Sequence, residues 1–262
     1  MNSSNGEDNF LRRTIRRVDS FFNDDTTYYA ASLSFFTIFS ILPIIALLIA
    51  IISSFSEFKN YLDIFINYIF NLINPTHSSD IVDALKNYVS NSNKLGFIGI
   101  IYMLFVFIMF IKDYEYIVNK IHKTKRKSIQ FSFIFYSIFM AILPLIFAFS
   151  NIIMSFYESN FFKEILSYIF SWIIFFALFK LTVNKHIDNK AALISSFITL
   201  MILSITKNLF IYYVIYNKTY STIYGSLSTL LFTFLWIYIS WIIYLYGIKM
   251  CHKLNVQVER KI

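Results

Sequence analysis

Long apolar stretches alternate with short polar segments over most of the chain. Six apolar stretches lie between charged residues, with their cores at residues 30–52, 95–111, 129–150, 165–180, 191–213 and 225–248. A helix needs about 20 mostly apolar residues to cross the hydrocarbon core of a bilayer. The stretches also lack the period-two alternation of a membrane β-strand. The pattern therefore predicts an all-α, polytopic membrane protein with six transmembrane helices, which forms a single membrane domain over residues 1–262.

Two features modify individual helices of this prediction. The fourth stretch is short, but Lys163 and Lys180 flank it and can extend their ammonium groups to the membrane interface. Pro43 and Pro144 lie inside the first and third stretches. Each proline removes one backbone hydrogen bond, so we expect a kink at both positions. A tolerated bend without a functional role is the alternative.

The distribution of lysine and arginine sets the predicted orientation. Seventeen of these residues fall in the N-terminal segment, in the connections between the second and third and the fourth and fifth stretches, and in the C-terminal tail, against five in the other connections. Cytoplasmic loops of membrane proteins carry such an excess of positive charge. We therefore expect a multi-pass protein of a bacterial-type plasma (inner) membrane, with the N and C termini in the cytoplasm.

Two segments outside the predicted spans are amphipathic. Residues 9–22 place apolar side chains on one helical face and four arginines on the other, which predicts an interfacial helix; a partner-binding helix is the alternative. Residues 53–94 predict an external helical loop of two helices, broken at Asn74-Pro75. This loop would pack on the bundle, cover a cavity as a lid, or dock a partner. Residues 1–8 are polar, and we expect them to be disordered.

Composition and charge agree with a protein that faces lipid. The chain is 57% hydrophobic and 15% charged, whereas soluble domains carry about 25% charged residues. The net charge of +8 does not require nucleic acid, because the basic loops would lie against an anionic leaflet. We therefore expect membrane lipids with anionic headgroups as partners, and no nucleic acid. A homo-oligomer and an unknown envelope protein partner both stay open.

The sequence contains no recognisable catalytic centre. Its histidines are far apart in sequence, and none has a second histidine at ligand spacing; they are His77, His122, His186 and His252. A glycine-rich phosphate loop and the common nucleophile motifs are also missing. We therefore expect no enzyme activity, no metal and no cofactor.

Lys207 is the residue that this pattern singles out. It lies within the fifth stretch and is followed by Asn208, and an ionisable residue inside a membrane helix is a candidate functional group. Lys207 would bind an anionic group in a polar cavity, or else extend outward or pair with a carboxylate. Glu115 and Asn119 share a helical face just beyond the second stretch and are further candidates. For Glu115, pairing with Lys112 or with the basic loop is the structural alternative.

Three segments resemble the YihY/BrkB family, whose members were formerly called ribonuclease BN. They are residues 29–43, residues 95–99 followed by Glu115 and Asn119, and residues 220–227 followed by Leu235-Trp236 and Gly247. The last is similar to the family's Tyr-Gly-x-Leu opening of its final span, which adds Tyr224 as a candidate binding residue and Gly225 as a structural one. The family often ends that span in Gly-Ala-Glu, whereas Ile248 and Lys249 follow Gly247 here.

The resemblance implies a six-span plasma-membrane protein tied to envelope integrity, and we expect no ribonuclease activity. Two functions stay open. The first is a transporter or translocator of a lipid or small anionic substrate, with a cavity near Lys207. The second is a non-transporting membrane scaffold or interaction protein, which a dry, fully packed bundle would favour. The sequence names neither a substrate nor a coupling ion.

Overall fold

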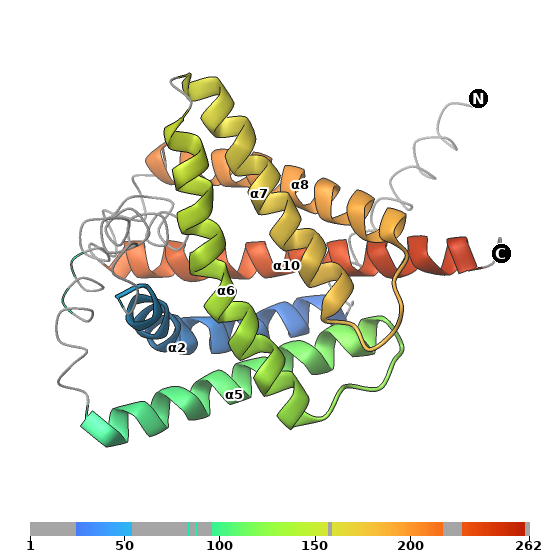
Figure 1. Cartoon of the computed structure of the whole chain (residues 1–262), viewed down its shortest axis with the longest axis horizontal. Helices are drawn as coiled ribbons and strands as arrows, with labels where there is room; N and C mark the ends of the chain where they lie inside the picture. Colours follow the sequence, from blue (N-terminus) through green and yellow to red (C-terminus); the bar gives the residue numbers. More distant parts are fainter. Residues whose placement is uncertain are drawn as a thin grey trace, which may run out of the picture.

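The computed structural model describes residues 25–53, 83, 87, 96–156, 159–216 and 227–259. Long helices make up almost all of this part of the chain (Figure 1): α2 (Asp25–Ser53), α5 (Gly96–Ile121), α6 (Ile129–Ser155), α7 (Asn160–Leu181), α8 (Asn189–Tyr216) and α10 (Leu227–Glu259). The predicted all-α class is confirmed. The predicted interfacial helix, nearly all of the external loop, Tyr224 and Gly225 lie outside the described residues.

Three helical segments among the described residues are long and apolar enough to cross a membrane. They are Phe161–Leu181, Asn189–Tyr216 and Leu230–Glu259. The chain is therefore a helical membrane protein. The described residues of the other three predicted stretches also fall within helices, namely α2, α5 and α6. Two helices continue well beyond the predicted spans, since α5 ends at Ile121 and α10 at Glu259.

Both prolines lie inside helices rather than at their ends, Pro43 in α2 and Pro144 in α6. In Figure 1 the ribbon of α2 changes direction along its length, so that one part lies in the plane of the view and the other is seen nearly end-on. A proline inside a helix produces such a bend, because it removes a hydrogen bond and its ring pushes against the preceding turn. A kink at Pro144 stays a prediction.

The helix α10 is central to the packing. It contacts α8, α2 and α5, and α7 packs on α8. The largest buried cluster is rich in aromatic side chains, and in it the hydroxyl oxygens of Tyr114 and Tyr244 lie 2.5 Å apart. Gly247 allows α10 to approach α8 closely, because a Cβ atom at this position would overlap the side chain of Thr199. Small residues at a helix crossing serve this purpose in membrane proteins.

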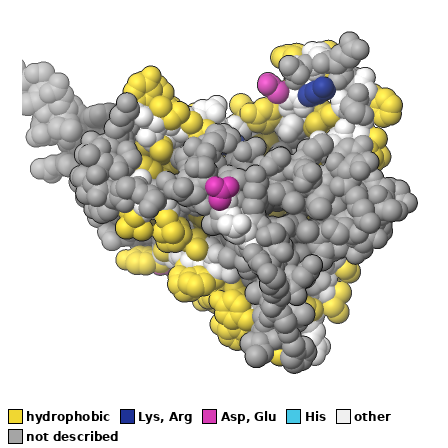
Figure 2. Space-filling model, turned by 90° about the vertical axis from the view of Figure 1, so that its left-hand side faces the viewer, with side chains coloured by type: hydrophobic (Ala, Val, Ile, Leu, Met, Phe, Trp, Pro, Cys, Tyr) yellow, Lys and Arg dark blue, Asp and Glu magenta, His cyan; other side chains and the backbone are white. Residues whose placement is uncertain are grey.

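The described surface is largely apolar. On α8 alone, the exposed large hydrophobic side chains are Leu193, Ile194, Phe197, Ile198, Met201, Ile202, Ile205, Leu209, Tyr212, Tyr213, Ile215 and Tyr216. On the side that lies on the left in Figure 1, the described side chains in view form several hydrophobic patches with few charged groups among them (Figure 2). Apolar patches of this extent are rare on soluble monomers. They are suited to contact with lipid.

Candidate functional site

Hydrogen bonds between distant segments gather at one end of the bundle, which we call the polar end. It comprises residues 122–128, residues 182–188 and the last turns of α10, and it lies on the right in Figure 1. The main-chain N–H of Asp188 donates to Asn255 Oδ1 at 2.7 Å, and Lys185 forms an ion pair with Glu259 at 2.7 Å. These contacts tie the segment before α8 to the end of α10.

Asn119, a predicted site residue, is a structural junction of the polar end. Its side chain is buried, and its Oδ1 atom accepts from the main-chain N–H of Asn184 at 2.7 Å and from Thr124 Oγ1 at 2.9 Å. Its Nδ2 atom donates to the main-chain oxygen of Glu115 at 2.9 Å. The side-chain amide thus serves as a structural link within the protein, and a role of Asn119 in substrate binding stays a prediction.

Two histidines that are distant in sequence meet at the polar end. The ring centroids of His122 and His252 are 5.2 Å apart, with the rings edge to face. His122 is buried, and neither of its ring nitrogens has a hydrogen-bond partner among the described residues. Burial, and then the positive charge of His252 and Lys185, lower the pKa of His122 to about 4. The two residues are far apart in the sequence and meet because the fold joins the end of α5 to α10.

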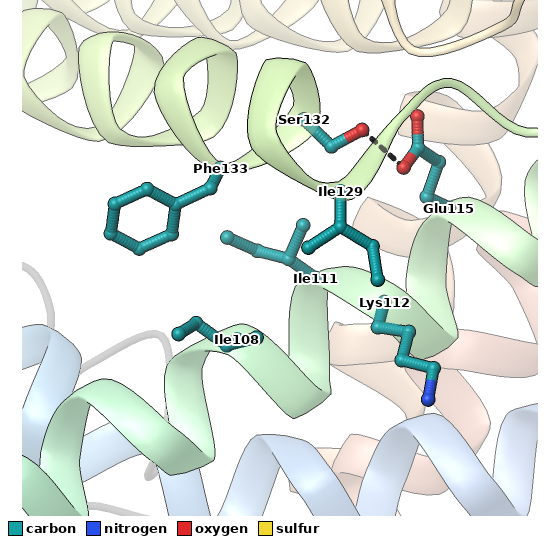
Figure 3. A pocket seen from close by; sticks show the side chains of 7 residues that line it. All are labelled: Ile108, Ile111, Lys112, Glu115, Ile129, Ser132 and Phe133. Carbon is teal, nitrogen blue, oxygen red and sulfur yellow. Dashed lines mark hydrogen bonds between the residues drawn. The ribbon is translucent and has the colours of Figure 1, made fainter.

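Glu115 does not pair with Lys112, in contrast to one of the sequence-based expectations. Its carboxylate is buried, and its Oε2 atom accepts a hydrogen bond from Ser132 in the first turn of α6. In Figure 3 the ammonium group of Lys112 points away from this carboxylate. The first turn of a helix favours a negative charge, because its unpaired N–H groups carry partial positive charge. The partner of Glu115 is therefore the first turn of α6 and not a lysine.

A small cavity lies between α5 and α6 at this carboxylate. It is lined by Ile108, Ile111, Lys112, Glu115, Ile129, Ser132 and Phe133 (Figure 3), and its volume is about 10 Å³. Such a volume is about the space that one water molecule needs. One turn further along α6, Tyr136 is also buried and its phenol interacts electrostatically with Glu115. Sequence reasoning identified Glu115 but missed Ser132 and Tyr136, because hydroxyl groups inside an apolar stretch give no distinctive pattern.

Lys207 and Asn208 lie on α8, apart from this cavity. Lys207 is half-buried and Asn208 is exposed. At about 1.5 Å of rise per residue, Lys207 is roughly 27 Å along α8 from its start at the polar end, whereas Glu115 is only about 9 Å from the end of α5. The structure thus does not bring Lys207 together with Glu115 or Asn119. Neither of the two cavities described lies at Lys207; the second adjoins His252 on the surface of the polar end.

The described residues contain no group of three or more histidine, cysteine, aspartate or glutamate side chains that could hold a metal ion. The arrangement instead offers two separate polar features. One is the half-buried ammonium group of Lys207 within an apolar helix. The other is the buried carboxylate of Glu115 with the hydroxyl groups of Ser132 and Tyr136.

Comparison with known proteins identifies the family. The family model described as "Virulence factor BrkB" matches residues 18–261. A UPF0761 membrane protein of Pseudoalteromonas atlantica is 29% identical over 208 residues, which cover 74% of this chain and 67% of the relative. One of Haemophilus influenzae is 29% identical over 199 residues, which cover 71% and 74%. No solved structure matches the chain. As the resemblance in its sequence implied, the chain belongs to the YihY/BrkB family of membrane proteins.

Proposed function

We propose that the chain crosses a bacterial-type plasma membrane six times, with both termini in the cytoplasm, and moves a lipid or another small anionic substrate across it. The six described helices, each of which contains all or nearly all of one predicted apolar stretch, support the topology. The polar end supports the orientation, since Lys123, Lys125, Arg126, Lys127 and Lys185 all lie in its loops. We propose no catalytic role.

The observation that carries the transport proposal is the position of Lys207. It is half-buried inside α8, a helix that meets the requirements of a membrane span despite this charge. Phe210 and Val214, three and seven positions further on, pack against Phe232 and Trp236 of α10. Residues at these spacings share one side of a helix, so Lys207 lies beside the seam between α8 and α10.

A cation at this depth is costly unless it has a counter-charge. Among the described residues, Lys185 forms an ion pair with Glu259 at the polar end, whereas no carboxylate pairs with Lys207. A phosphate or carboxylate group that passes along the seam would supply the missing charge. The substrate class that suits this position is therefore an anionic lipid or a small anion with an apolar part.

Lipid translocation in proteoliposomes tests the proposal. The probe is a fluorescent phosphatidylglycerol, and the variants are Lys207→Gln and, as a matched control, Lys190→Gln, which changes an exposed lysine at the start of the same helix. We expect the wild-type protein to move the probe and Lys207→Gln to slow it about tenfold or more, because one contact to a charged group is lost. Lys190→Gln should leave the rate unchanged.

Two other outcomes would contradict part or all of the transport proposal. Movement that survives Lys207→Gln would retain transport but remove Lys207 from the path. If folded wild-type protein moves neither this lipid nor lipids with other headgroups, the transport proposal is wrong.

A second candidate function is a non-transporting membrane scaffold, alone or as a homo-oligomer. The packing of the core favours it, because the described cavity between α5 and α6 has a volume of only about 10 Å³. Aromatic side chains fill the centre of the bundle, where Tyr114, Tyr244 and Trp241 lie with ring centroids 5.4–6.2 Å apart. In this case the polar end would hold lipids or partners without moving them.

A further inference from the structure

One residue of α5 and one of α6 have buried oxygen atoms with unused bonding capacity, and the two residues interact electrostatically. Glu115 Oε2 accepts from Ser132, but Glu115 Oε1 and the hydroxyl of Tyr136 have no hydrogen-bond partner among the described residues. Glu115 is 2% exposed and Tyr136 is 7% exposed. Ser132 and Tyr136 are four residues apart and thus on one side of α6. Buried polar atoms in native proteins are almost always paired, so this pair of unsatisfied oxygens indicates a missing partner.

The space beside these groups is small and otherwise apolar. Apart from Lys112, the cavity walls are the side chains of Ile108, Ile111, Ile129 and Phe133, with Glu115 and Ser132 as the polar members (Figure 3). The ammonium group of Lys112 is directed away from the carboxylate and its side chain is exposed. The carboxylate charge is therefore not already neutralised by this lysine, and a volume of about 10 Å³ admits only a ligand of about the size of a water molecule.

We propose that Glu115, Ser132 and Tyr136 form a binding site for a small monovalent cation of about the size of Na⁺. All the available donor atoms are oxygens, which are the ligands that hard cations prefer. One carboxylate supplies one negative charge. A monovalent ion would neutralise this charge, whereas a divalent ion would leave a net positive charge among isoleucine and phenylalanine side chains, at a high desolvation cost.

This site is independent of the proposed path at Lys207. It lies on α5 and α6 near the polar end, and a bound ion would stabilise the contact between these helices whether or not the protein transports anything. The experiment below therefore measures ion binding and not transport.

The test is the thermal stability of the purified full-length protein in detergent when NaCl replaces choline chloride at constant ionic strength. Because an ion that binds the folded state stabilises it, we expect NaCl to raise the Tm of the wild-type protein by about 4 °C. KCl should have a smaller effect, because K⁺ is larger than the cavity allows. Glu115→Gln and Tyr136→Phe should abolish or reduce the response, and wild-type protein should retain radioactive sodium on a desalting column.

Glu259→Gln is the matched control, because Glu259 is an exposed carboxylate paired with Lys185. This variant should keep the full response to sodium. If Glu115→Gln does not fold, Tyr136→Phe and direct sodium binding by the wild-type protein decide the question. The proposal is overturned if sodium and choline give the same Tm in the wild type, or if Tyr136→Phe and Glu115→Gln respond as fully as Glu259→Gln does.

Discussion

At the scale of single residues, the buried polar groups of this protein divide into satisfied and unsatisfied ones. Asn119 accepts two hydrogen bonds and donates a third, so its amide oxygen and one of its two N–H groups are used by the fold. His122 is equally buried, yet its ring nitrogens have no partner among the described residues. A buried imidazole of this kind remains neutral, since burial and neighbouring positive charge both oppose protonation.

The lowered pKa of His122 predicts acid-sensitive stability. The unfolded state takes up a proton at this side chain near pH 6.5, whereas the folded state does so only near pH 4, so the unfolded state binds more protons between these values. Stability should therefore decrease as the pH falls from about 6.5 to about 4, by up to about 3 kcal/mol. Thermal melts across this range check the prediction.

The variant His122→Phe should show a weaker pH dependence in the same window, because the ring is kept but the titrating group is removed. His186→Gln, which changes an exposed histidine, is the control and should melt as the wild type does at each pH. Equal slopes for wild type and His122→Phe would contradict the assignment.

At the same scale, the sequence identified Glu115 and Asn119 but not their hydrogen-bond partners. Glu115 and Asn119 stand out because they are polar and helically spaced, whereas Ser132 and Tyr136 lie inside an apolar stretch and resemble lipid-facing residues in the sequence. The lysine beside Glu115 suggested an ion pair, but the side chain of Lys112 reaches the surface instead. Which side chains pair across two helices depends on how the helices pack against each other, and this packing cannot be derived by inspecting a single sequence.

At the scale of helices, apolar patterning located the described helices well and their ends poorly. Each predicted stretch falls within a helix, apart from Leu95 and residues 225–226, which lie outside the described residues. The ends differ because hydropathy reports contact with lipid, whereas α5 and α10 continue into the polar end, where Asn119 and Asn255 are buried against other helices. Such positions resemble loop residues in the sequence, although they are helical.

The close crossing of α8 and α10 predicts that one added methyl group at Gly247 lowers the stability of the protein. In Gly247→Ala the new Cβ would overlap Thr199 Oγ1 and approach the ring of Phe179, so these side chains must move or the two helices must separate. We expect a loss of about 1–3 kcal/mol, as overpacking of a core commonly costs. Thermal melts in detergent provide the measurement.

A double variant distinguishes a local clash from a general effect of alanine at this position. Thr199→Ala removes the closest atom, so Gly247→Ala with Thr199→Ala should be more stable than the two separate losses added together. Strict additivity of the two changes would argue that Gly247 serves some purpose other than close approach.

At the scale of the whole molecule, the arrangement predicts which loops face which side of the membrane. The loop before α6 and the turn before α7 contain exposed serines, Ser128 and Ser159, at opposite ends of α6. In a Cys251→Ala background, an impermeant maleimide should label Ser159→Cys in intact cells. It should label Ser128→Cys only after the membrane is permeabilised. Labelling of Ser128→Cys in intact cells would reverse the proposed orientation.

The central position of α10 has a consequence for how the protein is made. This helix contacts α2, α5 and α8, yet it is the last of the described helices to leave the ribosome. The earlier helices are therefore made before the helix that fills the space between them. A translocon or chaperone that shields this space would act until α10 has been made. The bundle is therefore completed only at the end of synthesis. A nascent chain arrested before residue 227 would be a substrate for membrane proteases.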